Sequence, residues 1–441
     1  MAESGAMDPV RRQYELLPYP HREPEAERHR LLSTPLDDLE VLNQLAFRGT
    51  AKLTKGFRVL VAGGGTGDAT VFLAEQLRDT DARIVHLDLS SASIEVAQAR
   101  ARIRGLENVE FRRGSLLELR PDGGVFDYIN CVGVLHHLPE PPLGLAALEG
   151  VLAPQGVLGA MLYGQYGRAA VYQVQSLLRR IHTEPADTAT RLSDAREVLA
   201  ALPDHHWFNL AQDRHRGEVE ENGDAALFDL LLHAQDRAYT VPQLRVLLKN
   251  AGLPHATFLT LPESPVDYYE PASFLSPGPL LERVSARSLW ARRAIAEQLY
   301  GGIAMHLFYA TRQPDRALGL TETDAIPFFR SADAYADWPQ TLATLAERGS
   351  SARLRFACGP VEVPLPEGCA ALFRHLDGRR TLGQLLQKAA KGDAANPRQL
   401  LERMLPTLQV LHQRRLLLMR RKTARLPARL AGLTDQLTGS G

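Results

Sequence analysis

FRVLVAGGGTGDATVFLAEQL, residues 57 to 77, is the stretch that decides the fold. Its first part, Phe57–Ala62, is a short apolar run rich in β-branched side chains, which predicts a buried strand. Asp68–Leu77 then predicts a helix. The glycines between them let the backbone turn tightly and approach a ligand closely, and the free N–H groups of a helix start favour an anionic group. The stretch therefore predicts a strand, a ligand-binding glycine loop and a helix in direct succession.

The alternation of strand and helix continues along the chain, with one interruption. Before the interruption we expect strands at Arg83–Leu89, Asn108–Arg113, Phe126–Val134 and Val157–Leu162, and helices at Ser91–Gly105 and Pro142–Ala153. After it, a capping-box spacing at Thr240 and Gln243 opens a helix to Asn250, and strands at His255–Leu261 and Ile303–Thr311 flank a helix at Leu281–Leu299. Strands separated by helices predict βαβ units, so the expected fold is α/β with a doubly wound parallel sheet covered on both faces.

These patterns divide the chain into five parts. Residues 1–50 are expected to form a helical N-terminal extension, 51–312 the sheet domain, 313–340 a linker, 341–425 an accessory domain and 426–441 a tail. Residues 164–239 interrupt the sheet domain with predicted helices. Because they follow the fifth strand, they should lie beyond the carboxyl ends of the strands, where such folds bind ligands. We therefore expect a lid or a substrate-selecting insert.

The accessory domain predicts a small α+β unit. A strand or hairpin at Leu354–Pro366 precedes three expected helices, and an apolar run closes the unit. The helices are Gly368–Leu376, Thr381–Lys391 and Gln399–Arg414, and the apolar run is Leu416–Met419. Three helices with flanking strands favour a winged-helix-like domain.

Composition excludes several classes of protein. The chain has 441 residues, of which 45% are apolar, and its 51 Lys and Arg balance 51 Asp and Glu, so no overall charge holds it on nucleic acid or an anionic membrane. Cys131, Cys358 and Cys369 show no metal-binding spacing, which argues against a disulfide framework and a zinc site. The polar start and the lack of a long apolar run argue against secretion and membrane spanning. We expect a cytoplasmic protein.

The glycine spacing favours a nucleoside over a dinucleotide. The dinucleotide fingerprint G-x-G-x-x-G requires a small residue at position 68, where this chain has Asp68, and its glycines fall as G-x-G-x-G instead. A carboxylate in the first turn of the helix would oppose a pyrophosphate but not a positively charged ligand. Asp88 ends the next strand, where an acidic side chain can bind both ribose hydroxyls.

With these features, the chain from Phe57 to about Thr311 resembles a class I S-adenosylmethionine-dependent methyltransferase. The motifs that carry the resemblance are VLVAGGGTGDAT, HLDLS, GSLLEL, FDYINCVGVLHHLPEP and LAPQGVLGAMLY, in the family's order. The resemblance implies a Rossmann-like seven-stranded sheet, S-adenosylmethionine as the cofactor, and methyl transfer to a small molecule or to a protein or peptide side chain. The leader YELLPYPHREPEAE, Tyr14–Glu27, is similar to one that packs near the cofactor mouth in some members.

Carried over position by position, the resemblance assigns a set of cofactor-binding residues. Three glycines would lie under the methionine moiety, Asp88 would bind the ribose, and three further residues would contact the adenine and the methionine amine. The glycines are Gly63, Gly65 and Gly67, and the further residues are Ser115, the Leu116 backbone and the Cys131 carbonyl. Two positions depart from the family, because most members have an acid where Val61 stands and an Asp where Ser115 stands. Weaker cofactor binding follows, unless another group such as Asp68 compensates.

Candidate residues for the chemistry follow the fourth and fifth strands and end the insert. Methyl transfer needs aligned reactants and, where the nucleophile must lose a proton, one base. His137 can serve as that base near neutral pH, and Tyr163 can line the pocket, orient the substrate or only pack at its strand end. The alternative is that the histidines only cap a turn and pack beneath the insert. Further substrate-side or lid candidates are His136, Tyr166, Asp236, Arg237 and Tyr239. Asp236 and Arg237 would brace the lid as an ion pair, or Arg237 would bind a substrate carboxylate.

Other functions are weaker readings of the same sequence. The basic run Arg414–Arg429 could contact phosphates, but the fourth strand lacks the Asn/Asp-Pro-Pro-aromatic run of enzymes that methylate bases, which argues against an RNA or DNA methyltransferase. The adjacent His205 and His206 lack the spacing of a metal site, and no metal is expected. The departures at Val61 and Ser115 keep open a non-catalytic, cofactor-binding regulatory protein. A dehydrogenase is the least supported alternative, because Asp68 stands where the dinucleotide fingerprint requires a small residue.

Overall fold

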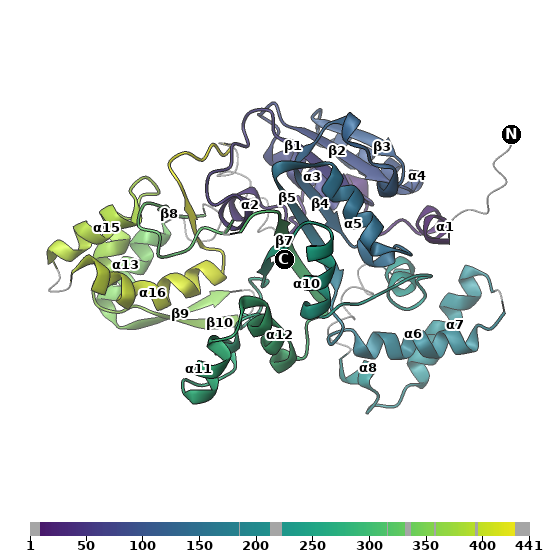
Figure 1. Ribbon diagram of the computed structural model, residues 1–441. Coiled ribbons are helices and arrows are strands. Elements are labelled where there is room, and N and C mark those ends of the chain that lie inside the picture. Colours follow the sequence, from purple (N-terminus) through teal and green to yellow (C-terminus); the bar gives the residue numbers. More distant parts are fainter. Residues whose placement is uncertain are drawn as a thin grey trace.

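The computed structural model describes residues 9–184, 186–211, 223–314, 316–330, 337–356, 359–392 and 396–427 (Figure 1). Its centre is a seven-stranded sheet in the order β3-β2-β1-β4-β5-β7-β6. The strands are β1 (Arg58–Ala62), β2 (Arg83–Asp88), β3 (Val109–Arg113), β4 (Phe126–Val132), β5 (Leu152–Tyr163), β6 (His255–Leu259) and β7 (Met305–Thr311). Strand β7 is antiparallel to both of its neighbours, and the pairs from β3 to β5 are parallel. The expected seven-stranded, doubly wound sheet is confirmed, but the expectation that it is parallel throughout was wrong, because β7 runs antiparallel between β5 and β6.

Helices cover both faces of the sheet, because alternate strand residues point to opposite sides. Val59 and Val61 belong to a core with α2 (Leu39–Ala46) and α3 (Asp68–Gln76). Leu60 and Ala62 belong to the opposite core, with α5 (Pro141–Gly150) and α10 (Val241–Asn250). Helix α4 (Ser91–Ile103) packs against α3, β2 and β3.

Local sequence signals fix where these helices begin. Gly67 precedes α3 with a φ of 100°, a left-handed conformation that favours glycine. The Ser90 side chain accepts a hydrogen bond from the Ser93 N–H at the start of α4. The capping box expected at Thr240 and Gln243 is present at the start of α10.

The interruption is helical, as the sequence predicted. It contains α6 (Ala169–Ile181), α7 (Thr188–Ala201), the short α8 (Trp207–Leu210) and a helix over residues 223–231. These helices share a hydrophobic core of their own, which includes Val174, Leu192 and Phe228. Figure 1 shows this insert as a separate lobe below α5. Residues 212–222 lie outside the described part of the chain.

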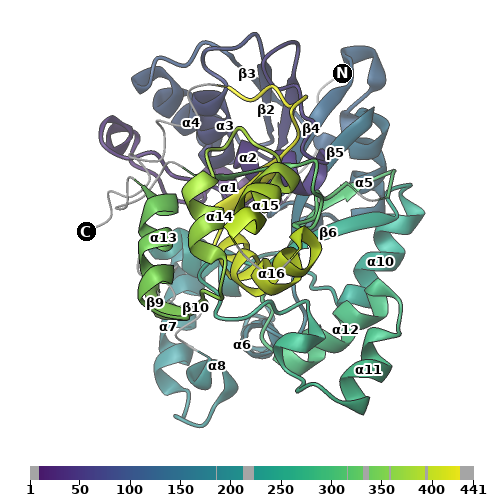
Figure 2. The ribbon, with the colours of Figure 1, turned by 90° about the vertical axis from the view of Figure 1, so that its left-hand side faces the viewer.

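The C-terminal unit has a third core, formed between Leu318 and Met419. It contains β8 (Ile326–Phe329), α13 (Trp338–Arg348), a hairpin of β9 (Ser351–Phe356) and β10 (Gly359–Pro364), α14 (Cys369–His375), α15 (Leu382–Ala389), α16 (Pro397–Gln413) and β11 (Leu417–Arg420), which pairs with β8. The expected hairpin and three helices are present, and α13 and β8 fall in or beside the proposed linker. Figure 2 shows these helices in front of the sheet. The winged-helix likeness stays a prediction, and residues 428–441 and Cys358 lie outside the description.

Two expected helix boundaries were wrong. The helix expected at Leu281–Leu299 is two helices, α11 (Pro279–Ser285) and α12 (Leu289–Tyr300), because Ser288 caps α12 by accepting from the Ala291 N–H. Helix α5 ends at Gly150, and β5 already begins at Leu152. The N-terminal extension contains α1 (Pro9–Leu16), the short helix η1 (Pro24–Arg28) and α2, joined by segments of turns and irregular chain.

The basic run after α16 is largely occupied within the protein. Arg414 donates hydrogen bonds to the carbonyls of Pro262, Ser264 and Pro265, and Arg415 donates to the carbonyl of Pro35. Arg421 pairs with Glu322 and Asp324. Arg414 and Arg415 thus join the C-terminal unit to the rest of the chain, and the Arg421 pairs lie within that unit. Their engagement argues against a phosphate-binding patch. Arg429 lies outside the described residues.

Candidate functional site

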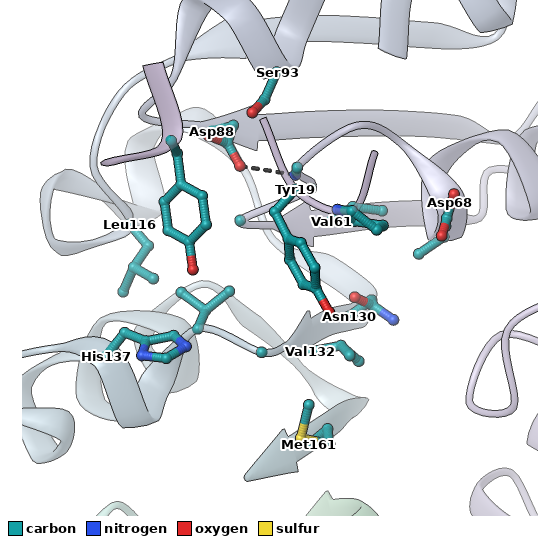
Figure 3. A pocket seen from close by; sticks show the side chains of 18 of the residues that line it. Tyr19, Val61, Asp68, Asp88, Ser93, Leu116, Asn130, Val132, His137 and Met161 are labelled. Carbon is teal, nitrogen blue, oxygen red and sulfur yellow. Dashed lines mark hydrogen bonds between the residues drawn. The ribbon is translucent and has the colours of Figure 1, made fainter. Parts of the chain in front are cut away.

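A cavity of about 410 Å³ lies at the carboxyl ends of β1, β2 and β4 (Figure 3). This volume is typical of a pocket for a cofactor or small ligand. The sheet side contributes residues 63–65, 87–89, 114–116 and 132–134, the N-terminal extension contributes Tyr14, Tyr19, Pro20 and residues 34–37, and the insert side contributes His137, Tyr163, Arg168 and Asp229. Figure 3 shows Val61, Asn130 and Val132 along one wall, with the Tyr19 ring in front of them.

The glycine loop reaches the cavity with no room for side chains. Gly63 and Gly65 have φ values of 74° and 51°. A Cβ atom on Gly63 would lie 2.3 Å from the Val134 side chain, and one on Gly65 would lie 2.9 Å from the Tyr19 carbonyl oxygen. The loop backbone is therefore the surface that a ligand meets. Gly67 caps α3 instead and is not among the cavity-lining residues.

Asp88 holds the glycine loop and faces the cavity. Its Oδ2 accepts a hydrogen bond of 2.8 Å from the Gly65 N–H, which Figure 3 marks, and its Oδ1 accepts one of 2.8 Å from the Ser90 N–H. Burial raises the pKa of this carboxyl group above its ordinary value. Each oxygen retains a further lone pair for a ligand hydroxyl.

Of the other residues predicted to bind the cofactor, two line the cavity and one lies in the core. Ser115 and Leu116 line the cavity, but Ser115 Oγ already accepts a hydrogen bond of 3.2 Å from the Leu117 N–H. Cys131 is fully buried in the core beneath the sheet and is not among the lining residues. Burial raises the pKa of its thiol to about 12. Only the backbone of Cys131 is therefore available to a ligand.

Asp68 is engaged by two arginines. Arg22 Nε and Nη2 donate to its carboxylate at 2.9 and 2.7 Å, and Arg100 Nη1 donates at 2.6 Å. Burial alone would raise the pKa of Asp68, but the hydrogen bonds from Arg22 and the charge of Arg100 lower it. The carboxylate is thus ionised and already paired, so the expectation that it compensates for Val61 does not hold.

Comparisons with known proteins indicate the family of the chain. The family model described as "Methyltransferase domain" matches residues 59–156. A protein of Synechococcus sp. described as uncharacterized is 30% identical over 353 residues, which are 79% of this chain and 81% of that protein. The chain belongs to the class I S-adenosylmethionine-dependent methyltransferases.

More distant matches include an O-methyltransferase and a solved structure. The ubiquinone biosynthesis O-methyltransferase of Hahella chejuensis is 32% identical over 179 residues, which are 39% of this chain and 64% of that enzyme. The structure of PKMT2 from Rickettsia typhi has a TM-score of 0.59 and 16% identity and covers 88% of this chain and 75% of its own. A second structure of that protein is a complex with AdoHcy, at a TM-score of 0.58. S-adenosylmethionine is the cofactor of the family to which this chain belongs.

A hydrogen-bonded chain forms the insert side of the methyltransferase cavity. The Gln235 N–H donates to His233 Nδ1 at 3.0 Å, so the neutral His233 ring carries its proton on Nε2 and donates to Tyr14 Oη at 3.3 Å. Tyr14 in turn donates to Asp229 at 2.9 Å. Burial lowers the pKa of His233 to about 2 and raises that of Asp229.

His137 lies against this chain with one free nitrogen lone pair. Its Nδ1 lies 2.8 Å from the Gln235 carbonyl oxygen and donates to it, so the neutral ring holds its lone pair on Nε2. Its ring stacks on that of His233, with centroids 3.7 Å apart. Tyr163 Oη donates to Asp229 at 3.4 Å. The sequence therefore identified two members, His137 and Tyr163, and missed Tyr14, Asp229 and His233.

His137, Asp229 and His233 offer donor atoms within 4.8 Å of one another, close enough to share a metal ion. The hydrogen bonds favour a different arrangement, because His233 Nδ1 accepts the Gln235 N–H and its Nε2 then carries a proton. A metal ligand needs a lone pair on that atom. The sequence predicts that His206 is not a metal ligand. In the structure its side chain caps α8 by accepting a hydrogen bond from the Phe208 N–H.

The remaining lid candidates lie behind the cavity wall. His136 is fully buried and stacks on Tyr163, with centroids 3.9 Å apart. Asp236 is fully buried and accepts hydrogen bonds from Arg168, Tyr172 and Gln175 at 3.2, 3.1 and 3.0 Å. The expected ion pair of Asp236 is therefore formed with Arg168 and not with Arg237.

Tyr239, Arg237 and Tyr166 also support rather than line the site. The Tyr239 N–H donates to the Tyr163 carbonyl at 2.8 Å. The Arg237 guanidinium lies over the Tyr239 ring, 5.4 Å from its centroid. Tyr166 Oη accepts a hydrogen bond of 3.1 Å from Gln298 on α12.

Among the described residues, no helix combines the length and the apolar character that crossing a membrane requires.

Proposed function

We propose that this methyltransferase acts on an amino group, carried by a small molecule or by a protein or peptide, with His137 as the base. The observation that carries the proposal is the buried Asp229 carboxylate at the cavity wall. Two tyrosine hydroxyls donate to it, and the described residues give it no ion pair. A buried carboxylate without an ion pair binds an ammonium ion through its charge and through charge-assisted hydrogen bonds.

The proposed reaction needs one proton transfer and one displacement. The acceptor ammonium gives a proton to His137 Nε2, and the freed nitrogen lone pair attacks the methyl carbon. The carbon–sulfur bond breaks, its electron pair stays on sulfur, and the products are S-adenosylhomocysteine and the methylated ammonium. Alignment of the two reactants supplies most of the acceleration.

The cofactor would lie along the sheet side of the cavity. We propose that its methionine end lies on Gly63 and Gly65, its ribose on Asp88, and its adenine beside Ser115 and Leu116. The Ser115 hydroxyl accepts from Leu117, so its own proton is available for the adenine. Gly67 would contribute by starting α3, and Cys131 through its backbone carbonyl.

The test is release of S-adenosylhomocysteine from the purified protein with panels of primary amines, lysine-containing peptides and phenols. Turnover of an amine is the expected result. His137→Gln should then lower kcat by roughly 10²- to 10⁴-fold, while the exposed His205→Gln serves as the matched control and should leave kcat unchanged.

A hydroxyl acceptor is the second candidate, because the Hahella relative is a ubiquinone biosynthesis O-methyltransferase. Turnover of phenols but not of amines would favour it. Binding of S-adenosylmethionine without turnover of any acceptor would instead favour the regulatory alternative.

A further inference from the structure

A second buried carboxylate, that of Asp37, lines the methyltransferase cavity on the cofactor side. The residue is 0% exposed and lies in the chain between η1 and α2. Thr34 Oγ1 donates to it at 2.6 Å, Tyr128 Oη at 2.9 Å, and Asn130 Nδ2 donates to both of its oxygens at 2.8 and 2.9 Å. Polar side chains of β4 and of its own segment thus hold the carboxylate in one place.

The register of the sheet puts this carboxylate beside Val61. In the parallel pairing of β1 with β4, Val61 is opposite Asn130, and the Asn130 amide binds both oxygens of Asp37. Val61, Asn130 and Asp37 all line the cavity, and Figure 3 shows the first two on the same wall. Val61 is the position where the family resemblance implies an acid. The structure therefore has a carboxylate next to that position, delivered by a different segment.

The carboxylate of Asp37 has no cationic partner among the described residues. Two arginines of the C-terminal unit that contact the residues beside Asp37 are engaged there, because Arg330 pairs with Asp38 and Arg415 donates to the Pro35 carbonyl. A buried carboxylate without a cation is costly, and a bound cation offsets that cost. S-adenosylmethionine carries an α-ammonium at its methionine end, which the proposed placement brings to this end of the glycine loop.

We infer that Asp37 binds the α-ammonium of the cofactor and replaces the acid that the family carries at the position of Val61. The N-terminal extension is then part of the cofactor site. The inference rests on the proposed placement of the methionine end and is independent of the acceptor.

The test compares ligands with and without the amino-acid part. S-adenosylhomocysteine, its analogue without the α-amino group, and 5′-methylthioadenosine are titrated by calorimetry into the wild type and Asp37→Asn. In the wild type, loss of the amino group should weaken binding by roughly 10- to 100-fold, the range of one charge-assisted hydrogen bond. Asp37→Asn should weaken S-adenosylhomocysteine by a similar factor, bind it no better than the analogue, and leave 5′-methylthioadenosine within about twofold.

Two further variants make the result specific. Asp37→Asn combined with Val61→Asp should recover affinity for S-adenosylhomocysteine, because it returns an acid to the β1 position. Asp81→Asn is the control, since Asp81 is exposed and is not among the cavity-lining residues; it should leave the ratio between the ligands unchanged.

Three outcomes would overturn the inference. In the first, Asp37→Asn binds S-adenosylhomocysteine and 5′-methylthioadenosine more weakly by the same factor. In the second, the affinity of Asp37→Asn for both ligands is unchanged. In the third, the wild type binds S-adenosylhomocysteine and its deaminated analogue with equal affinity. The last measurement needs no variant and so does not depend on the stability of Asp37→Asn. Because no acceptor is present in any titration, failure here is distinct from failure of the proposed amine methylation.

Discussion

Arg100→Met tests most directly how the glycine loop is held. Arg100 lies on α4, is 1% exposed, and donates to Glu27 at 2.8 Å, to the Thr66 carbonyl at 2.8 Å and to Asp68 at 2.6 Å. One guanidinium thus joins the N-terminal extension, the loop and the start of α3. Methionine keeps much of the volume but removes the charge and every hydrogen bond.

The magnitude follows from what the partners retain. Removing one member of a buried ion pair costs about 3 to 5 kcal/mol, because a charge is left uncompensated. Glu27 keeps its pair with Arg104, and Asp68 keeps its pair with Arg22. We therefore expect a loss at the lower end of that range, about 3 kcal/mol, together with weaker cofactor binding because the loop carries Thr66 and Asp68.

The assay is urea unfolding followed by far-ultraviolet circular dichroism, with calorimetric titration of S-adenosylhomocysteine alongside. Arg102→Met is the control, since Arg102 is exposed on the same helix and its replacement should change stability by less than about 0.5 kcal/mol. The reasoning is refuted if Arg100→Met loses no more stability than Arg102→Met.

Three other predictions concern buried groups around the site. Burial lowers the pKa of His86 to about 4 from its ordinary 6.5, so the unfolded chain binds more protons between these values. Stability should fall by up to about 3 kcal/mol as the pH drops through that window, and this part of the loss should be missing in His86→Gln, measured by urea midpoints at both ends. A Cβ on Gly64 would lie 2.3 Å from the His86 ring, so Gly64→Ala should cost about 1 to 3 kcal/mol; an equal cost in a His86→Ala background would contradict that cause. Asp236→Asn leaves the buried Arg168 without its ion-pair partner, so a protease should cleave the insert faster in this variant. Arg237→Gln should be cleaved at the wild-type rate. Equal cleavage rates for the two variants would show that Asp236 does not hold the insert.

The sheet and its order of elements could be predicted because each strand carries its own signal. Phe57–Ala62 is apolar, ends at a glycine turn and precedes a helix, and these are local properties. One boundary failed although its signal is local, because Ser288 caps α12 within what the apolar pattern suggested was one helix. The apolar pattern runs across that break, so period alone gives no warning of it.

The site was predicted only where its residues follow a strand. Asp88 is the last residue of β2, and His137 ends the short helix η4 (Leu135–His137) that follows β4, so the fold alone brings them to the cavity. Tyr14 and Asp229 are 215 positions apart and meet only when the insert packs on the N-terminal extension. The sequence gives no sign that Asp37 belongs to the site. An acid at the start of a helix is expected to be its N-cap, and the neighbouring Asp38 fills that role at α2.

The segment that carries Asp37 is also held by the C-terminal unit. Arg330 pairs with Asp38, Arg415 donates to the Pro35 carbonyl, and the Met419 N–H donates to the Gln44 side chain at 2.9 Å. An acid on β1 would need only the sheet to be in place. An acid delivered by residues 35–44 needs that segment docked, and the docking contacts come from β8, the end of α16 and β11. If Asp37 binds the cofactor ammonium, cofactor affinity and docking of the C-terminal unit must be linked, because each favours the same position of one short segment.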